Sequence, residues 1–285
     1  MKAAHHRLHF SERPLLVGVL NVTPDSFSDG GLYESQESAV ARARQMVEEG
    51  ADIIDIGAES SRPGSEPVSE TEELRRLIPV VEAVHDAVSV PLSVDTTKSG
   101  VARRAVQAGA VIVNDISAMT FDPGMARVVS ESGAGVVLMH MQGIPRTMQR
   151  APRYDDIVKE VHAFLADRLQ VAEAAGISRK QIILDPGIGF GKLLEHNLTL
   201  LAQLSMFSNL GRPLLVGISR KGFIGQILQR SVGDRLFGTA AAVAIAVQQG
   251  AAMLRIHDVA AMRDVVRTAT AISHYTDRVH EVPHA

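Results

Sequence analysis

Residues 16–31 read LVGVLNVTPDSFSDGG, and in this stretch an apolar run of strand length leads directly into a long polar loop. The run begins at Leu15 and contains no polar side chain, as expected of a strand that is buried on both faces. A doubly wound nucleotide-binding sheet would carry the pattern G-x-G-x-x-G after its first strand, and the pattern is absent here. The doubly wound sheet is therefore the second choice, behind a barrel.

Apolar runs of the same kind recur along the chain, and helix-like segments separate them. The predicted strands are residues 15–22, 52–58, 91–96, 111–117, 135–140, 182–187, 214–219 and 253–259. The predicted helices include residues 35–49, 70–87, 100–108, 156–175 and 239–249, and many of these segments end at a glycine, the usual helix stop. Eight strand–helix units fit the length of a single-domain α/β fold, the (β/α)8 TIM barrel.

No proline- or serine-rich linker and no low-complexity segment divides the chain. We therefore expect one barrel domain over residues 14–275, with an N-terminal extension at 1–13 and a C-terminal tail at 276–285. The opening residues MKAAHHRLHF lack the apolar segment of a secretion signal, so a cytoplasmic location is expected.

The composition excludes several classes of function. A formal charge of −3 on 285 residues gives no basic surface for nucleic acid or an anionic membrane. The longest apolar run, residues 240–247, is too short to cross a bilayer. The chain has no cysteine for disulfide or thiolate chemistry, and no pair of histidines has the spacing of a zinc or redox-metal site. Small molecules are the expected partners.

Polar residues stand at the carboxyl end of every predicted strand. They are Asn21, Glu59, Asp95, Asn114, His140, Asp185, the run Ser219, Arg220 and Lys221, and Arg255 with His257. A single polar residue in such a place is more often a turn or helix cap than a ligand group. In a (β/α)8 barrel, however, all carboxyl ends open on the face where active sites lie. The full set therefore predicts a binding site on that face.

The residue types in this set indicate what the site binds. Asp95, Asn114 and Asp185 offer hydrogen-bonding groups at the mouth of an apolar barrel, which suits a flat heterocycle with amide and amino edges. Arg255 and His257 alternate along the last strand and so point to one face. Two donors side by side favour an anion such as phosphate.

Two further groups follow strands seven and six. Arg220 and Lys221 are two cations that we expect to face the barrel mouth, with a solvated charge pair as the alternative. The glycine-rich run at 185–192, DPGIGFGK, does not match a phosphate-binding P-loop. A tight turn that brings backbone close to a ligand explains it better.

The loop at 59–68 is long and follows the second strand, as the loop of residues 21–31 follows the first. Its far end has a structural explanation, because Ser69 and Glu72 fit a capping box for the next helix. The segment 61–63 has none. Long loops on this face of a barrel are commonly lids, and we expect the segment to reach over the mouth.

Taken in order, these motifs resemble the dihydropteroate synthase family over about residues 14–260. The motifs are NVTPDSFSDGG at 21–31, SSRPG at 60–64, SVDT at 93–96, NDI at 114–116, MHMQG at 139–143, DPGIGFGK at 185–192, SRK at 219–221 and RIHDV at 255–259. The resemblance implies a TIM-barrel transferase that joins 6-hydroxymethyl-7,8-dihydropterin diphosphate to 4-aminobenzoate and releases diphosphate. It also implies Mg²⁺, a homodimer formed through outer helices, and sulfonamides as competitors.

The same resemblance assigns residues to the pterin diphosphate. The pterin would be held by Asp95, Asn114, Asp185 and Lys221, with Ile116 and Met139 against its faces. Arg255 and His257 would bind the diphosphate, and Asn21 would reach it through Mg²⁺ as the metal ligand. The expected catalytic residues are Asp29, Lys221, Arg255 and His257.

By resemblance, the aminobenzoate site comprises Phe27, Ser61, Arg62, Pro63, Phe190, Lys221 and Gly222. The loops after strands one and two would close over the pterin diphosphate, bringing Asp29 near a cationic intermediate. Ser61 stands where the family usually has threonine, and Gly222 stands where many members have serine. The aminobenzoate carboxylate would then rely on the backbone N–H of Gly222 and on Lys221.

Two other functions remain open at this point. A pterin-binding methyltransferase domain shares the barrel and the acidic pterin site, but it has no use for the two aminobenzoate loops or for a diphosphate clamp. A non-catalytic barrel that serves as a partner in folate synthesis should have lost site residues, and none is lost here.

Overall fold

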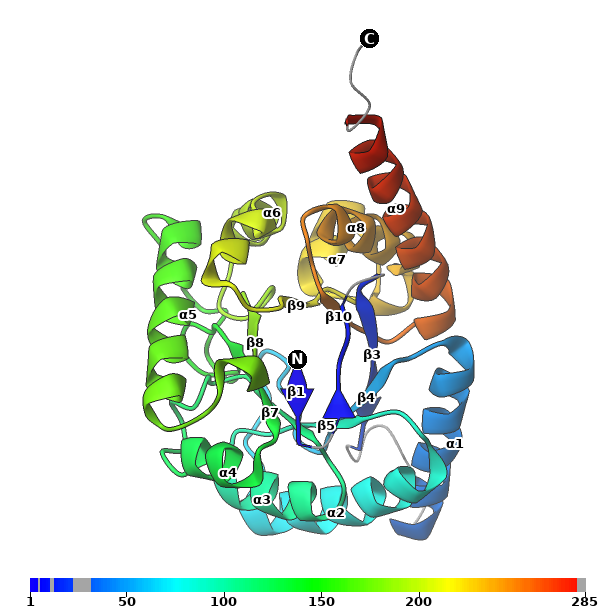
Figure 1. Cartoon of the computed structure of the whole chain (residues 1–285), viewed down its shortest axis with the longest axis vertical. Coiled ribbons are helices and arrows are strands. Elements are labelled where there is room, and N and C mark those ends of the chain that lie inside the picture. The colour runs from blue at the N-terminus through cyan, green and yellow to red at the C-terminus, as the bar shows by residue number, and fades with distance from the viewer. Residues whose placement is uncertain (5, 11–12, 23–31, 281–285) are drawn as a thin grey trace.

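The computed structural model describes residues 1–4, 6–10, 13–22 and 32–280, and eight parallel strands of this part of the chain form one sheet (Figure 1). They are β3 (Leu15–Asn21), β4 (Ile53–Gly57), β5 (Leu92–Asp95), β6 (Ile112–Asp115), β7 (Gly135–Met139), β8 (Ile182–Asp185), β9 (Leu215–Gly217) and β10 (Met253–Ile256). The strand order is β8-β7-β6-β5-β4-β3-β10-β9, and a parallel bridge between Leu184 and Leu214 joins the two edges. The predicted (β/α)8 barrel is confirmed.

Helices surround the barrel (Figure 1). They are α1 (Leu32–Glu49), α2 (Glu70–Ala87), α3 (Ser99–Gln107), α4 (Met125–Ser132), α5 (Ile157–Ala174), α6 (Leu194–Ala202), α7 (Gly222–Leu228), α8 (Leu236–Gln248) and α9 (Val259–His280). Short 3₁₀ turns cover Arg179–Gln181, Leu204–Leu210 and Val232–Asp234. The five helices that the sequence analysis delimits are present as α1, α2, α3, α5 and α8. Helices α4, α6 and α9 follow the other strands of the eight predicted strand–helix units, and α7 precedes α8 in the unit of β9. In the described ranges, no helix has both the length and the apolar character needed to cross a membrane.

The start of α2 corrects one detail of the sequence analysis. Ser69 caps the helix as predicted, because its Oγ accepts the backbone N–H of Glu72 at 3.3 Å. The carboxylate of Glu72 does not complete the capping box. It accepts from Arg75 at 2.7 Å and from Arg76 at 2.6 Å on the same helix instead.

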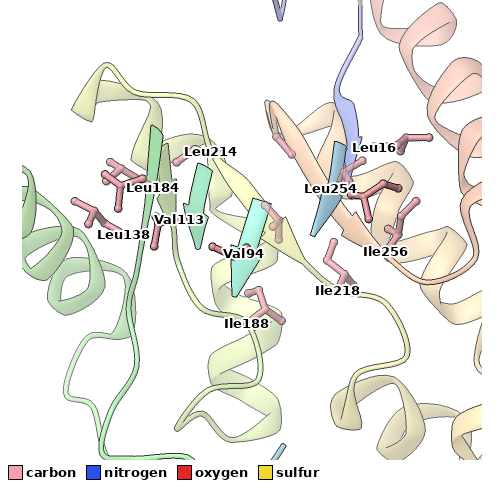
Figure 2. Close-up of a cluster of buried hydrophobic side chains, with 14 of the residues drawn as sticks. Leu16, Val94, Val113, Leu138, Leu184, Ile188, Leu214, Ile218, Leu254 and Ile256 are labelled. Carbon is pink, nitrogen blue, oxygen red and sulfur yellow. The ribbon is translucent and has the colours of Figure 1, made fainter. Parts of the chain in front are cut away.

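Each strand alternates between two environments, because successive side chains in a strand point to opposite faces. On β4, Ile54 and Ile56 belong to the large core between sheet and helices, where Figure 2 shows Leu16, Leu138 and Leu184 among the buried side chains. Ile53 belongs to a second apolar cluster, here named the floor. The floor comprises Ala3, Leu8, Val17, Ile53, Val111, Ile112, Val137, Ile183, Leu215 and Met253.

The N-terminal segment closes the barrel beneath the floor. Strands β1 (Lys2–Ala3) and β2 (His6–Arg7) form an antiparallel hairpin that lies over the end of the ring in Figure 1. Ala3 is fully buried, and the backbone N–H of Ala4 donates to the carbonyl of Gly133 at 2.8 Å. The hairpin therefore keeps water from the apolar floor, which lies two residues below the polar ends of the strands.

This arrangement predicts that the hairpin contributes to stability and not to ligand binding. Leu8→Ala removes a buried side chain of the floor and should lower the free energy of unfolding by about 2–4 kcal/mol. Denaturant titration measures the change, and His9→Ala, at the exposed neighbouring position, is the control. Equal stability of the two variants would mean that the hairpin does not pack on the floor.

Candidate active site

One pocket opens at the carboxyl ends of the strands, above the floor. Its lining residues are Asp95, Asn114, Ile116, Met139, Asp185, Gly187, Ile188, Phe190, Gly217, Lys221 and Arg255. All six residues predicted to bind a pterin line this pocket, together with Phe190 from the predicted aminobenzoate set and Arg255 from the predicted diphosphate set. The strand register explains the convergence, since Asp95 pairs with Asn114 and Met139 pairs with Asp185 on neighbouring strands.

An arginine held by two carboxylates lies at the centre of the pocket. Arg255 of β10 donates from Nε to Oδ2 of Asp55 at 2.6 Å and from Nη2 to Oδ2 of Asp95 at 3.0 Å. Burial raises the pKa of Asp95 to about 7; the Arg255 charge opposes this shift, and the Asp55 charge adds to it. Asp95 is therefore close to half-protonated near neutral pH.

Asp185 and Lys221 form the second charged pair of the pocket. Burial raises the pKa of Asp185 to about 6, and burial lowers the pKa of Lys221 to about 8 against the opposing charge of Asp185. Oδ1 of Asp185 accepts the N–H of Gly187 at 2.7 Å, so this oxygen also caps the following turn. The Lys221 ammonium lies 4.1 Å from the centre of the Phe190 ring. Lys221 thus stands between the pterin set and the aminobenzoate set.

The glycine-rich run forms the expected tight turn. Gly187 has a φ of +70°, and a Cβ on it would lie 1.8 Å from the carbonyl oxygen of His140. Lys192, almost completely buried, donates to Nδ1 of His140 at 2.9 Å and to the carbonyl of Phe190 at 3.0 Å. Burial lowers the pKa of His140 to about 3, which keeps the ring neutral and able to accept this bond. The turn is thereby fixed to the end of β7.

His257 lies just beyond β10, and its ring nitrogen Nδ1 is 3.0 Å from Oγ of Ser219. The backbone N–H of His257 donates to the same hydroxyl oxygen, so Ser219 holds both the backbone and the ring of His257 in place. Burial, assisted by the Arg255 charge, lowers the pKa of His257 to about 4. The ring is therefore neutral near neutral pH, and it brings no charge to a bound anion. Asn21 ends β3, the strand that pairs with β10.

Six of the predicted strand-end residues are not part of the pocket lining: Asn21, Glu59, His140, Ser219, Arg220 and His257. Two of these, Arg220 and Glu59, are held by ion pairs. Arg220, with a φ of +60°, donates from Nε to Asp258 at 3.0 Å, so the expectation that it faces the mouth beside Lys221 is wrong. Glu59 pairs with Lys98, which also binds the buried Glu73 at 2.5 Å. By bonding to both Glu59 and Glu73, Lys98 joins the start of the 59–68 loop to α2. The role of Glu59 is therefore structural.

The loop after β4 contacts the loop after β7. The N–H of Gly64 donates to the carbonyl of Pro145, in the loop after β7, at 3.1 Å. Arg146 and Glu66 add an exposed ion pair at 3.4 Å. Ser61, Arg62 and Pro63 lie on this loop at exposed or half-exposed positions and outside the pocket lining.

Gly222 begins α7 directly after Lys221. Asp29 and Phe27 lie outside the described residues.

Sequence reasoning missed Asp55 and underrated Lys192. Asp55 interrupts the apolar run of β4, and its inward direction follows from the two-residue period that it shares with Ile53 and Gly57. A search of strand ends does not find a carboxylate in mid-strand. In the sequence, Lys192 is only the last residue of the glycine-rich run, and its burial depends on contacts with His140 that a local motif does not encode.

The geometry defines a class of enzyme: a (β/α)8 barrel whose mouth offers buried carboxylates, an amide and two cations to a flat polar heterocycle. A family model described as "Pterin binding enzyme" matches residues 17–257. The dihydropteroate synthase of Escherichia coli strain K12 is 48% identical over 258 residues, which cover 90% of this chain and 91% of the relative. The chain therefore belongs to the dihydropteroate synthase family of pterin-binding transferases.

Solved structures of relatives agree with this assignment. The dihydropteroate synthase of Yersinia pestis, in complex with a sulfonamide drug, matches 98% of this chain and 99% of that chain, with a TM-score of 0.89 and 44% identity. The Xanthomonas albilineans enzyme in complex with 7,8-dihydropteroate has a TM-score of 0.83 and 44% identity, with 97% of each chain covered.

The turn after β8 allows a test of how closely the pocket depends on one backbone contact. Gly187→Ala should reduce turnover at least tenfold and lower the melting temperature, because its new methyl group would collide with the His140 carbonyl. Gly133→Ala is the matched control, since Gly133 has a φ of +69° and open space around its Cβ position. The control should show only the strain of the positive φ, about 1 kcal/mol, with normal activity. Similar behaviour of both variants in thermal and kinetic assays would contradict this explanation.

Proposed function

We propose that the chain joins 6-hydroxymethyl-7,8-dihydropterin diphosphate to 4-aminobenzoate and releases diphosphate and 7,8-dihydropteroate. The observation that carries the proposal is the single pocket that contains all six expected pterin residues together with Phe190 and Arg255. Incubation with both substrates, followed by assays of diphosphate and dihydropteroate, tests it directly. A methyltransferase domain would release no diphosphate, and a non-catalytic barrel would form neither product.

The pterin is recognised by its hydrogen-bonding edge. The oxygens of Asp95 and Asp185 accept N–H groups of the heterocycle, and Asn114 and Lys221 complete the edge. Ile116 and Met139 cover the flat faces, because both are buried apolar residues of the pocket lining. The polar ring thus gains partners that replace the water it loses.

The diphosphate binds beside Arg255, at the junction of β10 and β3. Arg255 has N–H groups that neither Asp55 nor Asp95 uses, and the neutral ring of His257 adds a hydrogen-bonding group. Mg²⁺, a cation that prefers oxygen ligands, would be held here mainly by the diphosphate. The side-chain oxygen of Asn21 would hold it, and the ion would neutralise charge on the leaving diphosphate.

The reaction transfers the pterin-methyl group from oxygen to nitrogen. The C–O bond to diphosphate breaks with both electrons leaving on oxygen, the aminobenzoate amine forms the new C–N bond, and the amine then loses a proton. C–O cleavage runs ahead of C–N formation, so the pterin-methyl carbon becomes cationic and must be protected from water. Asp29 stabilises this charge, and Lys221 bridges the two substrates.

The aminobenzoate site forms against Phe190, with Phe27 on the other loop. Lys221 and the backbone N–H of Gly222 bind the carboxylate of aminobenzoate, and sulfonamides compete for the same place. Ser61, Arg62 and Pro63 close this site as a lid. The bond between Gly64 and Pro145 supports the proposal, because it joins this loop to the loop after β7.

The assembly is proposed to be a homodimer with a cytoplasmic location. Helices α8 and α9 carry large exposed apolar side chains, among them Phe237, Ile245, Ile272 and Tyr275. Such side chains on adjacent helices suit an interface between two copies. Light scattering should give the mass of a dimer at micromolar concentration, and cell fractionation tests the location.

The charged pocket predicts a bell-shaped pH profile. kcat/KM for the pterin diphosphate should rise as Asp185 and Asp95 lose protons, near pH 6 and 7, because only the ionised forms accept all the N–H groups. It should fall above about pH 8, where Lys221 loses its charge. Lys221→Arg should shift only the alkaline limb, and it should shift that limb to higher pH. This shift is expected whatever the substitution does to the maximal value of kcat/KM. An unmoved alkaline limb would assign that limb to another group.

The role of the first loop can be tested without disturbing the barrel. Asp29→Asn should leave the affinity for pterin diphosphate unchanged and lower kcat roughly ten- to a thousandfold, as expected for one electrostatic group aimed at a transition-state charge. Asp25→Asn, the same charge change in the same loop, should retain near-normal kcat. Equal losses in the two variants would point to the charge of the loop in general.

A further inference from the structure

Asp55 lies at the inward position of β4 between the floor and the barrel mouth. Its side chain is 1% exposed, and it does not line the pocket itself. Oδ2 accepts two donors, Nε of Arg255 at 2.6 Å and Nδ2 of Asn114 at 3.2 Å. Oδ1 is buried and has no hydrogen-bond partner in the described residues. The carboxylate thus joins two residues of the pocket from behind.

A neighbouring aspartate shows what a purely structural carboxylate looks like in this barrel. Asp115 of β6 is also fully buried, but its bonds are local: Oδ1 accepts from Ser117 and Oδ2 accepts the N–H of Met119 at 2.8 Å. All of them stabilise its own turn. Asp55 has no such local bonds and leaves one oxygen unsatisfied, which is costly for a group that serves stability alone.

The contact with Asn114 determines what this residue presents to the ligand. A carboxylate can only accept hydrogen bonds, so the atom of Asn114 that faces Asp55 is the amide nitrogen. The amide oxygen of Asn114 therefore remains for the pocket, where it accepts an N–H of the heterocycle. With a neutral amide in place of Asp55, this orientation would no longer be enforced.

The contact with Arg255 determines the direction of the guanidinium. Because Asp55 binds Nε and Asp95 binds Nη2, the group is held in one plane by two strands, β4 and β5. Its remaining N–H groups point away from these carboxylates and are available to an anion. A guanidinium that kept only one of the two partners could rotate about that bond.

We propose that Asp55 is a positioning residue that couples the two halves of the substrate site, orienting Asn114 for the pterin and Arg255 for the diphosphate. The proposal rests on the proposed function. It predicts that a single substitution, at a residue that touches neither half of the substrate, weakens the binding of both.

Asp55→Asn tests the coupling, because it keeps the shape and removes the charge. The probes are 6-hydroxymethylpterin for the ring half and inorganic diphosphate with Mg²⁺ for the anion half, each titrated by calorimetry. Both affinities should fall about tenfold. Asp115→Asn, the control, should bind both probes as the wild type does, although it loses stability. If Asp55→Asn does not fold, Asp55→Ser takes its place with the same expectation.

A double-mutant cycle adds a readout that a structural role would not move. If Asp55 acts on the ring through Asn114, the double variant of Asp55→Asn and Asn114→Ala should bind the pterin no more weakly than Asn114→Ala alone. Additive losses, or loss of only one probe, would overturn the coupling, and so would normal binding of both probes by Asp55→Asn. Failure of the wild type to bind either probe would count against the proposed function instead.

Discussion

The guanidinium of Arg255, buried between Asp55 and Asp95, is the interaction on which the rest of the site depends. It places a cation among three inward carboxylates, since Asp185 lies in the same pocket. Buried ion pairs are weak evidence for stability, because desolvation offsets much of their attraction. The apolar floor and the hairpin beneath it supply hydrophobic stabilisation, which offsets the cost of burying these charges. The stability of the barrel therefore comes from the floor, and the chemistry belongs to the mouth.

The sequence predicted the barrel and its mouth because both follow from local rules. Strands buried on both faces read as apolar runs, and polar groups at their carboxyl ends must meet on one face. No such rule gives the direction of a side chain beyond the end of a strand. Arg220 points away from the pocket because its backbone is left-handed and its guanidinium binds Asp258. Asp55 was missed for the opposite reason, since its partners come from strands far away in the sequence.

The two sides of the pocket are held with different firmness. The turn that carries Phe190 is fixed by Lys192, His140 and the close approach of Gly187 to β7. Among the described residues, the loop that carries residues 61–63 is joined to the loop after β7 by one backbone bond and one exposed ion pair, and exposed pairs contribute little. A rigid pterin pocket beside a weakly attached loop suits an enzyme that binds its activated substrate first and completes the second site afterwards.

The charges of the pocket also explain why the proposed substrate is a pterin that carries a diphosphate group. In the proposed complex, the heterocycle brings N–H groups that bond to Asp95 and Asp185. Arg255 bonds to Asp55 and Asp95 and would also bind the phosphate groups. An anion alone would compete with Asp95 for the guanidinium and favour protonation of that carboxyl. A ligand that joins ring and diphosphate avoids the conflict, because its ring occupies Asp95 while its diphosphate takes the free N–H groups of Arg255. The site is therefore complementary to the two halves as one molecule, and less so to either half alone.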